Sequence, residues 1–161
     1  MKEQVDPSLA IPGFQSALDA GALERLPCQL HTHLWRVQDR AGGWRMTYMD
    51  VEEGKIRSMF MVIRNGFLDD GSPVFAIGYA TTPENQRKGI GKKLARESTE
   101  ELVGALKAIG TKRFAIEARV HRDNIPSQII ARATLGVEPQ PFTDNKAGHD
   151  SLLYELVIEQ G

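Results

Sequence analysis

Cysteine, long apolar runs and repeats are scarce or missing in this sequence. Cys28 is the single cysteine among 161 residues, so the chain can form neither an intrachain disulfide nor a cysteine-rich metal cluster. The longest unbroken apolar run near the middle, residues 59–63, is far below the roughly 20 residues that a membrane-spanning helix needs. Residues 1–13 lack the apolar stretch of a signal peptide. We therefore expect one cytoplasmic domain over residues 1–161, without membrane contact.

An excess of charge is missing as well. The 20 Lys and Arg residues nearly balance the 21 Asp and Glu residues, which gives a net charge of -1 and a pI of about 6.4. This balance argues against nucleic acid as the main partner. The hydrophobic fraction of 41% is ordinary for a globular protein and predicts a single packed core.

The first half of the chain has the pattern of a short helix followed by antiparallel strands. Apolar residues at helical spacing within residues 14–26 predict a short helix, or a helix pair interrupted by Gly21. Residues 29–38 and 44–51 predict a hairpin, and residues 56–64 predict a third strand. The Asn65-Gly66 and Asp70-Gly71 pairs then predict a loop before the next apolar run.

The second half contains the pattern of a βαβ unit. Residues 74–82 form a continuous apolar run, typical of a strand buried on both faces. An amphipathic helix between Gly91 and Gly110 and a strand over residues 113–120 follow, and this order requires parallel strands. One more helix and two closing strands around a polar loop are predicted at residues 126–134, 137–142 and 151–158. The sequence therefore predicts an α/β (α+β) fold with a mixed sheet.

The segment between the buried strand and the long helix carries the strongest functional signal. It contains two glycines, which allow a ligand to approach the backbone, and it opens a helix whose first amides are unsatisfied. It also contains four cations: Arg87, Lys88, Lys92 and Lys93. Cations in a first turn oppose the helix dipole, so a purely structural turn would more often contain acids. We predict that this loop binds a polyanion such as a pyrophosphate; the alternative is a solvated basic turn.

Two common nucleotide motifs do not fit this segment. A Walker loop would need Lys and Ser/Thr after its second glycine, whereas Gly91-Lys92-Lys93 lacks that frame, and Leu94 stands at the third glycine of the dinucleotide fingerprint. The string Gln86-Arg87-Lys88-Gly89-Ile90-Gly91 instead resembles motif A of the GNAT family of N-acyltransferases. Asn124-Ile125-Pro126-Ser127 is similar to the Asn and small residue that open the next helix in that family. The resemblance covers residues 74–136.

The resemblance implies a GNAT-like mixed sheet, with antiparallel N-terminal strands and a central splayed parallel pair flanked by helices. It implies acetyl-CoA as co-substrate, with the pantetheine arm between the splayed strands and the pyrophosphate on the loop. The residues that it assigns to cofactor binding are Tyr79, Ala80, Thr81, Gln86, Arg87, Lys88, Gly89, Ile90, Gly91, Lys92, Asn124 and Ser127. Asn124 has a second interpretation as the N-cap of the following helix.

Transfer to an amine needs a base, because a free primary amine has a pKa near 10. Glu117 is a candidate, since Ile116-Glu117-Ala118-Arg119 is similar to a run in the GNAT branch that acetylates ribosomal-protein N-termini. The alternative is a structural Glu117 paired with Arg119 or Arg113. His121 is a candidate proton shuttle, or else an exposed loop histidine.

One position departs from the family pattern. Many relatives have a tyrosine four residues before the glycine that matches Gly136, where this chain has Arg132. Candidates for the acid that protonates the thiolate are then Ser127, His121, Tyr154 or water.

The predicted function is N-acetyl transfer from acetyl-CoA to a primary amine, in a small molecule or at a peptide or protein N-terminus. The alternatives are a catalytically silent acyl-CoA-binding module and a protein- or RNA-modifying member of the family. A second copy of the chain is a further candidate partner, with which it would form a homodimer. No metal is expected, since His31 and His33 on one predicted strand lack a third ligand.

Overall fold

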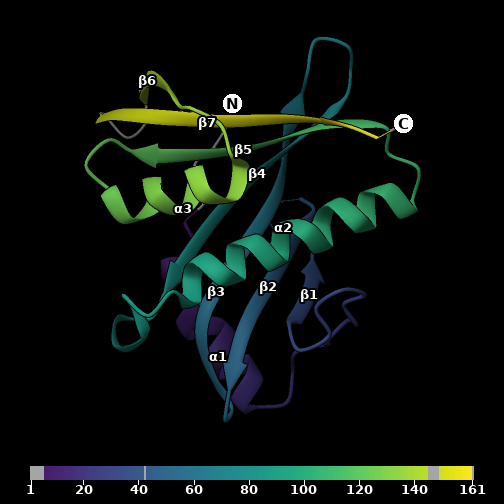
Figure 1. The fold of residues 1–161 in the computed structure, drawn as a ribbon. Coiled ribbons are helices and arrows are strands. Elements are labelled where there is room, and N and C mark those ends of the chain that lie inside the picture. The colour runs from purple at the N-terminus through teal and green to yellow at the C-terminus, as the bar shows by residue number, and fades with distance from the viewer. Residues whose placement is uncertain (1–5, 42, 145–148, 161) are drawn as a thin grey trace.

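The computed structural model describes residues 6–41, 43–144 and 149–160 (Figure 1). Its elements follow in this order: η1 (Pro7–Leu9), α1 (Ile11–Asp19), β1 (Trp35–Asp39), β2 (Arg45–Glu52), β3 (Lys55–Phe67), β4 (Pro73–Thr81), η2 (Pro83–Asn85), α2 (Ile90–Ala108), β5 (Arg113–His121), α3 (Ile125–Leu135), β6 (Gln140–Asp144) and β7 (His149–Glu159). Among the described residues, none of these helices is long and apolar enough to cross a membrane.

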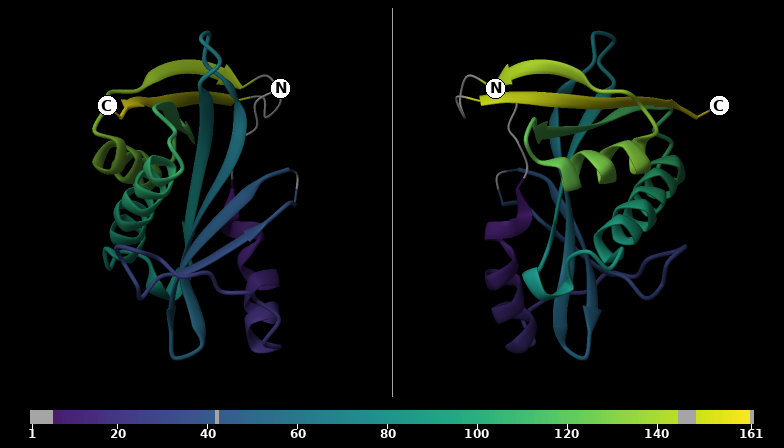
Figure 2. Two further views of the ribbon diagram at one scale, coloured as in Figure 1. Left: turned by 90° about the vertical axis from the view of Figure 1, so that its right-hand side faces the viewer. Right: turned by 60° about the vertical axis from the view of Figure 1, so that its left-hand side comes forward.

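The strands form one seven-stranded sheet in the order β1-β2-β3-β4-β5-β7-β6. Neighbouring strands are antiparallel except for β4 and β5, which are parallel. Helices α2 and α3 cover one face, and α1 lies on the other (Figure 2). The predicted mixed sheet with a central parallel pair is confirmed.

The core lies mainly between the sheet and α2. The buried side of α2 carries Leu94, Leu102 and Leu106, which pack against aromatic and aliphatic side chains of β3, β4 and β5. A second apolar cluster lies under α1, around Phe14 and Met59. Apolar residues at helical spacing on α2 therefore fix that helix to the sheet, and with it the loop at its N-terminus.

The parallel pair parts before its strands end. The register between β4 and β5 runs from Val74 opposite Ala115 to Ile77 opposite Ala118. Beyond that point β4 continues to Thr81, still paired with β3, and β5 continues to His121, still paired with β7. The two strands are thus splayed at their carboxyl ends, as predicted.

The predicted strand over residues 29–38 is wrong in its first half. Residues 29–34 form a loop, and β1 begins at Trp35. Backbone N–H groups of this loop donate to the carboxylate of Glu101, a buried residue of α2; the bond from Gln29 is 3.1 Å long. A carboxylate that takes several consecutive amides removes the donors that a strand ladder would use.

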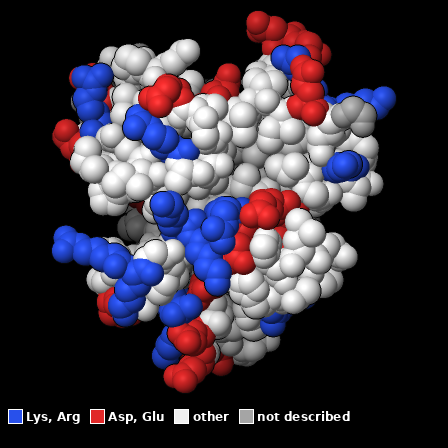
Figure 3. All heavy atoms as spheres, viewed as in Figure 1, with Lys and Arg blue, Asp and Glu red and all other residues white. Residues whose placement is uncertain are grey.

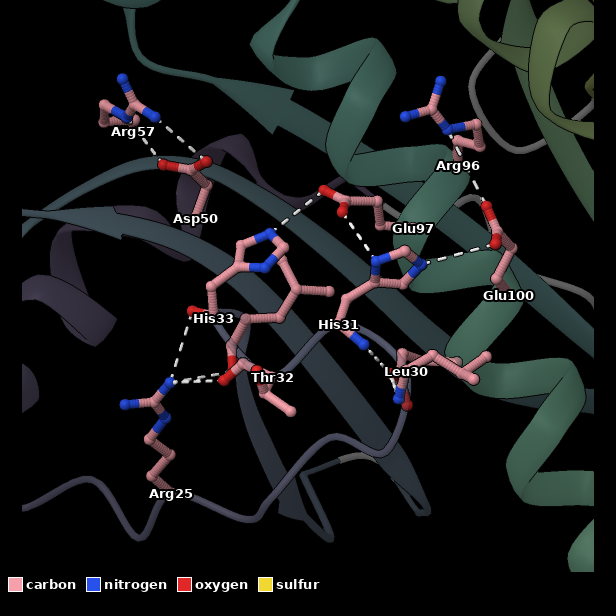
Figure 4. A network of polar contacts seen from close by, with 12 residues as sticks. Arg25, Leu30, His31, Thr32, His33, Asp50, Arg57, Arg96, Glu97 and Glu100 are labelled. Carbon is pink, nitrogen blue, oxygen red and sulfur yellow. Dashed lines mark hydrogen bonds and ion pairs between the residues drawn. The ribbon is translucent and has the colours of Figure 1, made fainter.

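The two histidines of this loop also bind α2 rather than sharing a strand face with Trp35. His31 Nδ1 lies 2.8 Å and His33 Nε2 3.2 Å from the carboxylate of Glu97, and His31 Nε2 lies 3.4 Å from Glu100 (Figure 4). The loop is therefore held to the helix by side-chain contacts that local periodicity does not encode.

Of the two turn pairs predicted to mark a loop, Asn65-Gly66 lies within β3, whereas Asp70-Gly71 lies in the turn between β3 and β4. The register with β4 shifts between Arg64 and Phe67, and Gly66 has a φ of 88°. This is a β-bulge, in which a glycine takes the positive φ. Smaller differences are the bounds of α1, which runs from Ile11 to Asp19, and the start of β6 at Gln140. Of the predicted polar loop, Asp144 and His149 belong to β6 and β7, and residues 145–148 lie outside the described residues.

Candidate active site

A cleft opens where β4 and β5 part. Its walls are formed by the ends of both strands and by the start of α3, with one residue from the N-terminal segment. The lining residues are Asp6, Ile77, Gly78, Tyr79, Ala118, Arg119, Val120, Asn124 and Ser127. Four residues predicted to bind the cofactor, Tyr79, Ala80, Asn124 and Ser127, lie on or beside these walls. The splayed strands therefore bring together segments that are distant in the sequence.

The predicted anion loop lies at the same end of the sheet. Gly89 is the N-cap of α2 with a φ of 77°, and no side chain of the described residues caps this end. Arg87 also has a positive φ, 62°. Gln86 Nε2 donates to the carbonyl of Thr81 at 3.1 Å and so ties the loop to β4. A glycine-rich turn followed by uncapped helix amides is a suitable cradle for phosphate oxygens.

Exposed cations surround this loop. Figure 3 shows Lys and Arg side chains gathered over the start of α2 and the loop before it. A surface pocket between α2 and α3 is lined by Gly89, Lys92, Lys93, Arg96, Ala133 and Thr134. Arg96 was missed by the sequence analysis; its spacing of four residues from Lys92 places both on one helix face and was the available signal.

Gly91 has a role that its sequence position did not reveal. A Cβ added there would lie 2.6 Å from Thr81 Oγ1. The missing side chain therefore allows α2 to approach β4, whereas at Gly89 a Cβ would meet nothing within 4 Å. Of the two glycines, Gly89 is the one whose open side faces the space available to a ligand.

Asn124 and Ser127 are linked to each other and to β4. Asn124 Oδ1 accepts from the backbone N–H of Ser127 at 3.2 Å, so Asn124 is the N-cap of α3. The hydroxyl of Tyr79 donates to the carbonyl of Ser127 at 2.6 Å, across the cleft. The start of α3 is therefore held against the end of β4.

Glu117 lies deeper than the cleft, opposite Ala76 where the strands are still paired. Its side chain is fully buried. Asn65 Nδ2 donates to Glu117 Oε1 at 2.8 Å, and Arg119 Nε lies 3.5 Å from the same oxygen. The two side chains meet across β4, whose Ala76 pairs with Glu117. The structural pairing with Arg119 that the sequence suggested is present, and Asn65 is a partner that it missed.

His121 lies at the open end of β5. Its side chain is 36% exposed, and the backbone N–H of Asp123 donates to Nδ1 at 3.0 Å. The Asp123 carboxylate lies 3.8 Å from the same nitrogen. His121, Arg119 and Glu117 share the face of β5 that points away from α2 and α3, since the alternate residues belong to the core under those helices.

Comparison with solved structures identifies the fold. No protein-family model matches the chain, and no curated protein matches it in sequence. Solved structures do match. An acetyltransferase from Salmonella typhimurium that modifies the N-terminal serine of a ribosomal subunit protein has 18% identity and a TM-score of 0.52, with 73% of this chain and 66% of that chain covered.

Two further structures agree with this match. The putative acetyltransferase yncA from Salmonella typhimurium, solved with acetyl-CoA, has 17% identity and a TM-score of 0.53, with 73% and 66% covered. A GNAT-family acetyltransferase from Streptococcus pneumoniae has 14% identity and a TM-score of 0.51, with 71% and 66% covered. The chain has the GNAT fold. Its matched part spans about two thirds of the length of each of these proteins.

Proposed function

We propose that this chain is an acetyl-CoA-dependent N-acetyltransferase that acts on a primary amine. The proposal rests on one observation. The cleft between β4 and β5 opens at the same end of the sheet as the uncapped, basic start of α2. A long ligand with a diphosphate at one end and a thioester at the other matches this arrangement. The solved neighbours with the GNAT fold include acetyltransferases, one of them with acetyl-CoA, which supports the same class.

The residues of the chain fit this ligand. The first amides of α2, at Ile90 and Gly91, would hold the diphosphate, with Arg87, Lys88 and Lys92 around it. The open edge of β4 at Tyr79 to Thr81 would pair with the amide groups of pantetheine. A fixed backbone N–H at this edge would polarise the thioester carbonyl, which needs no reorganisation during the reaction.

The amine would approach from the face of β5 that carries His121. We propose His121 as its base, because His121 is partly exposed at the end of β5, directly after Val120 of the cleft wall, whereas Glu117 is fully buried four residues earlier in the strand. A proton taken at Nδ1 would replace the contact from the Asp123 N–H, and the Asp123 carboxylate would stabilise the imidazolium. Glu117 would then act by holding Arg119, whose side chain lines the cleft.

A catalytically silent acyl-CoA-binding module is the second candidate. It is favoured by Arg132, which stands where relatives have a tyrosine and instead pairs with Glu138 at 3.2 Å, exposed to solvent. Such a module would bind acetyl-CoA without releasing thiol.

Two measurements separate these functions. Acetyl-CoA at millimolar concentration should raise the melting temperature, as any ligand of the native state does. Release of free thiol should then be followed with a panel of amines that includes small molecules and peptides with free N-termini. A thermal shift with thiol release supports the enzyme, and a shift without release from any amine supports the silent module. No shift contradicts both.

A further inference from the structure

The ring of Tyr79 spans the cleft from β4 to α3. Tyr79 lies two residues beyond Ile77, the last residue of β4 that pairs with β5. Its hydroxyl donates to the Ser127 carbonyl at 2.6 Å, and its ring stacks on Phe60 with centroids 6.3 Å apart and an interplanar angle of 12°. Both ends of the side chain are thus fixed, and the hydroxyl is held at the wall of the cleft on the side of Asn124 and Ser127.

The opposite wall provides room for this hydroxyl. In the turn of α3 that faces β4, Ala131 is fully buried and Arg132 points to solvent, where it pairs with Glu138. Tyr79 packs against the core cluster that contains Ala131. A small residue on the helix therefore faces a phenol from the sheet, so the phenol in the cleft comes from β4 rather than from α3.

Tyr79 is the tyrosine that can reach a ligand in this cleft. The chain contains three tyrosines, and the other two, Tyr48 and Tyr154, are fully buried and do not line the cleft. Burial, followed by the nearby Tyr154, raises the pKa of Tyr79 well above its usual value. The phenol therefore keeps its proton at neutral pH and can donate a hydrogen bond to a charged group in the cleft.

We propose that the Tyr79 hydroxyl is the acid that protonates the departing thiolate, which rests on the acetyl transfer proposed above. The amine nitrogen forms a bond to the thioester carbonyl carbon, the carbon–sulfur bond breaks with its electron pair on sulfur, and Tyr79 gives its proton to that sulfur. The amine loses one proton to the base, and solvent carries an equivalent proton back to the phenolate. The products are an amide and a free thiol, with no net proton consumed. Before the ligand is bound, the Ser127 carbonyl keeps the hydroxyl in position.

The thiol of bound CoA gives a direct test that needs no amine acceptor. Its titration is followed by the ultraviolet absorbance of the thiolate in the wild type, Tyr79→Phe and Tyr48→Phe. Phenylalanine keeps the ring and its stacking on Phe60 but removes the donor. A lost hydrogen bond to a charged sulfur should raise the thiol pKa in Tyr79→Phe by about 1–2 units. The control variant Tyr48→Phe should titrate as the wild type does, since Tyr48 is fully buried and does not line the cleft.

Kinetics and a second variant sharpen the test. Tyr79→Phe should lower kcat by roughly 10²-fold or more and leave the KM for acetyl-CoA nearly unchanged. Site-specific replacement of Tyr79 by fluorotyrosine, a more acidic phenol, should shift the thiol pKa in the opposite direction. A wild-type thiol titration in either variant overturns the proposal. A wild-type protein that binds no CoA overturns the acetyltransferase function itself.

Discussion

The two ends of the candidate site are built from different parts of the chain. The end at α2 consists mainly of backbone: uncapped helix amides, a glycine with positive φ and a strand edge. The end at β5 consists of side chains, with Glu117, Arg119 and His121 on one strand face and Asn65 from β3 beside them. The first end can bind a ligand through backbone groups, whose positions are determined by the conformation of the chain. The chemistry of the second end depends on its side chains. Contacts between residues far apart in the sequence decide which of these side chains are buried and which are accessible.

The largest effect that follows from this difference is expected at His121. His121→Ala removes the proposed base, so turnover with an amine should fall by roughly 10²–10⁴-fold while the affinity for acetyl-CoA stays the same. Raising the pH should recover part of the loss, because more of the amine is then neutral. Steady-state kinetics and a binding titration measure the two quantities separately.

His33→Ala is the matched control for this variant. His33 is a partly exposed histidine on the loop before β1, and it contacts Glu97 of α2. Neither residue lines the cleft. Its turnover per folded molecule should equal that of the wild type. Equal losses in both variants would mean that His121 acts through stability, and would return Glu117 to the role of base.

Glu117 should affect stability more than turnover. Glu117→Gln can keep the hydrogen bond from Asn65 but leaves Arg119, which is 18% exposed, without its ion-pair partner. Breaking an ion pair in which one partner is fully buried should lower the free energy of unfolding by about 2–4 kcal/mol. This corresponds to a melting temperature lower by about 5–15 °C. Thermal unfolding measures the shift.

The control is Glu155→Gln on β7. Glu155 lies directly opposite Glu117 in the β5–β7 register but is exposed, so its replacement should change stability by less than about 0.5 kcal/mol. A turnover loss of the size expected for His121→Ala, with an unchanged melting temperature, would instead identify Glu117 as the base.

The same contrast explains what the sequence predicted. The strand, loop and helix from residue 74 to residue 110 were predicted closely, because hydrophobic period, glycines and cations are local properties of the chain. The splay of β4 and β5 followed from a family resemblance carried by that same segment. The elements that form the proposed cofactor side were therefore predictable from the sequence, and the roles of its individual residues stay predictions.

The proposed acceptor side was harder to predict because its determinants are not local. Asn65 is 52 residues from Glu117, and its bulge had the sequence signature of a loop. The loop at residues 29–34 is shaped by Glu101, 72 residues after Gln29, so strand propensity gave the wrong answer there. Burial of Glu117 depends on three neighbouring strands together, which a period-two pattern in β5 alone cannot indicate.

The two glycines of the loop offer a way to separate packing from ligand approach. Gly91→Ala should destabilise the protein by about 1–3 kcal/mol, because its Cβ would lie 2.6 Å from Thr81 Oγ1. Gly89→Ala should cost about 1 kcal/mol from its positive φ, with open space around the new Cβ. Denaturant unfolding measures both.

A second variant identifies the contact at Gly91. In a Thr81→Ala background the clashing oxygen is gone, so adding Gly91→Ala should cost little. An undiminished cost in that background would show that the helix and strand are kept close by a different contact.

The smallest effect is expected from the cations around the loop. Lys92 is exposed in the first turn of α2, so Lys92→Gln removes one partly screened charge worth about 0.3–1 kcal/mol near a bound diphosphate. The affinity for acetyl-CoA should fall by about 2–5-fold at low salt, and the difference should shrink as ionic strength rises, because exposed charges are screened. Lys107→Gln, an exposed lysine in the last turn of the same helix, removes the same charge far from the loop and should leave the affinity unchanged. If both variants weaken binding equally, the anion is attracted by the overall field of the protein and not by this loop. If Lys92→Gln alone does so, the charge adds to a site whose position the backbone amides already determine.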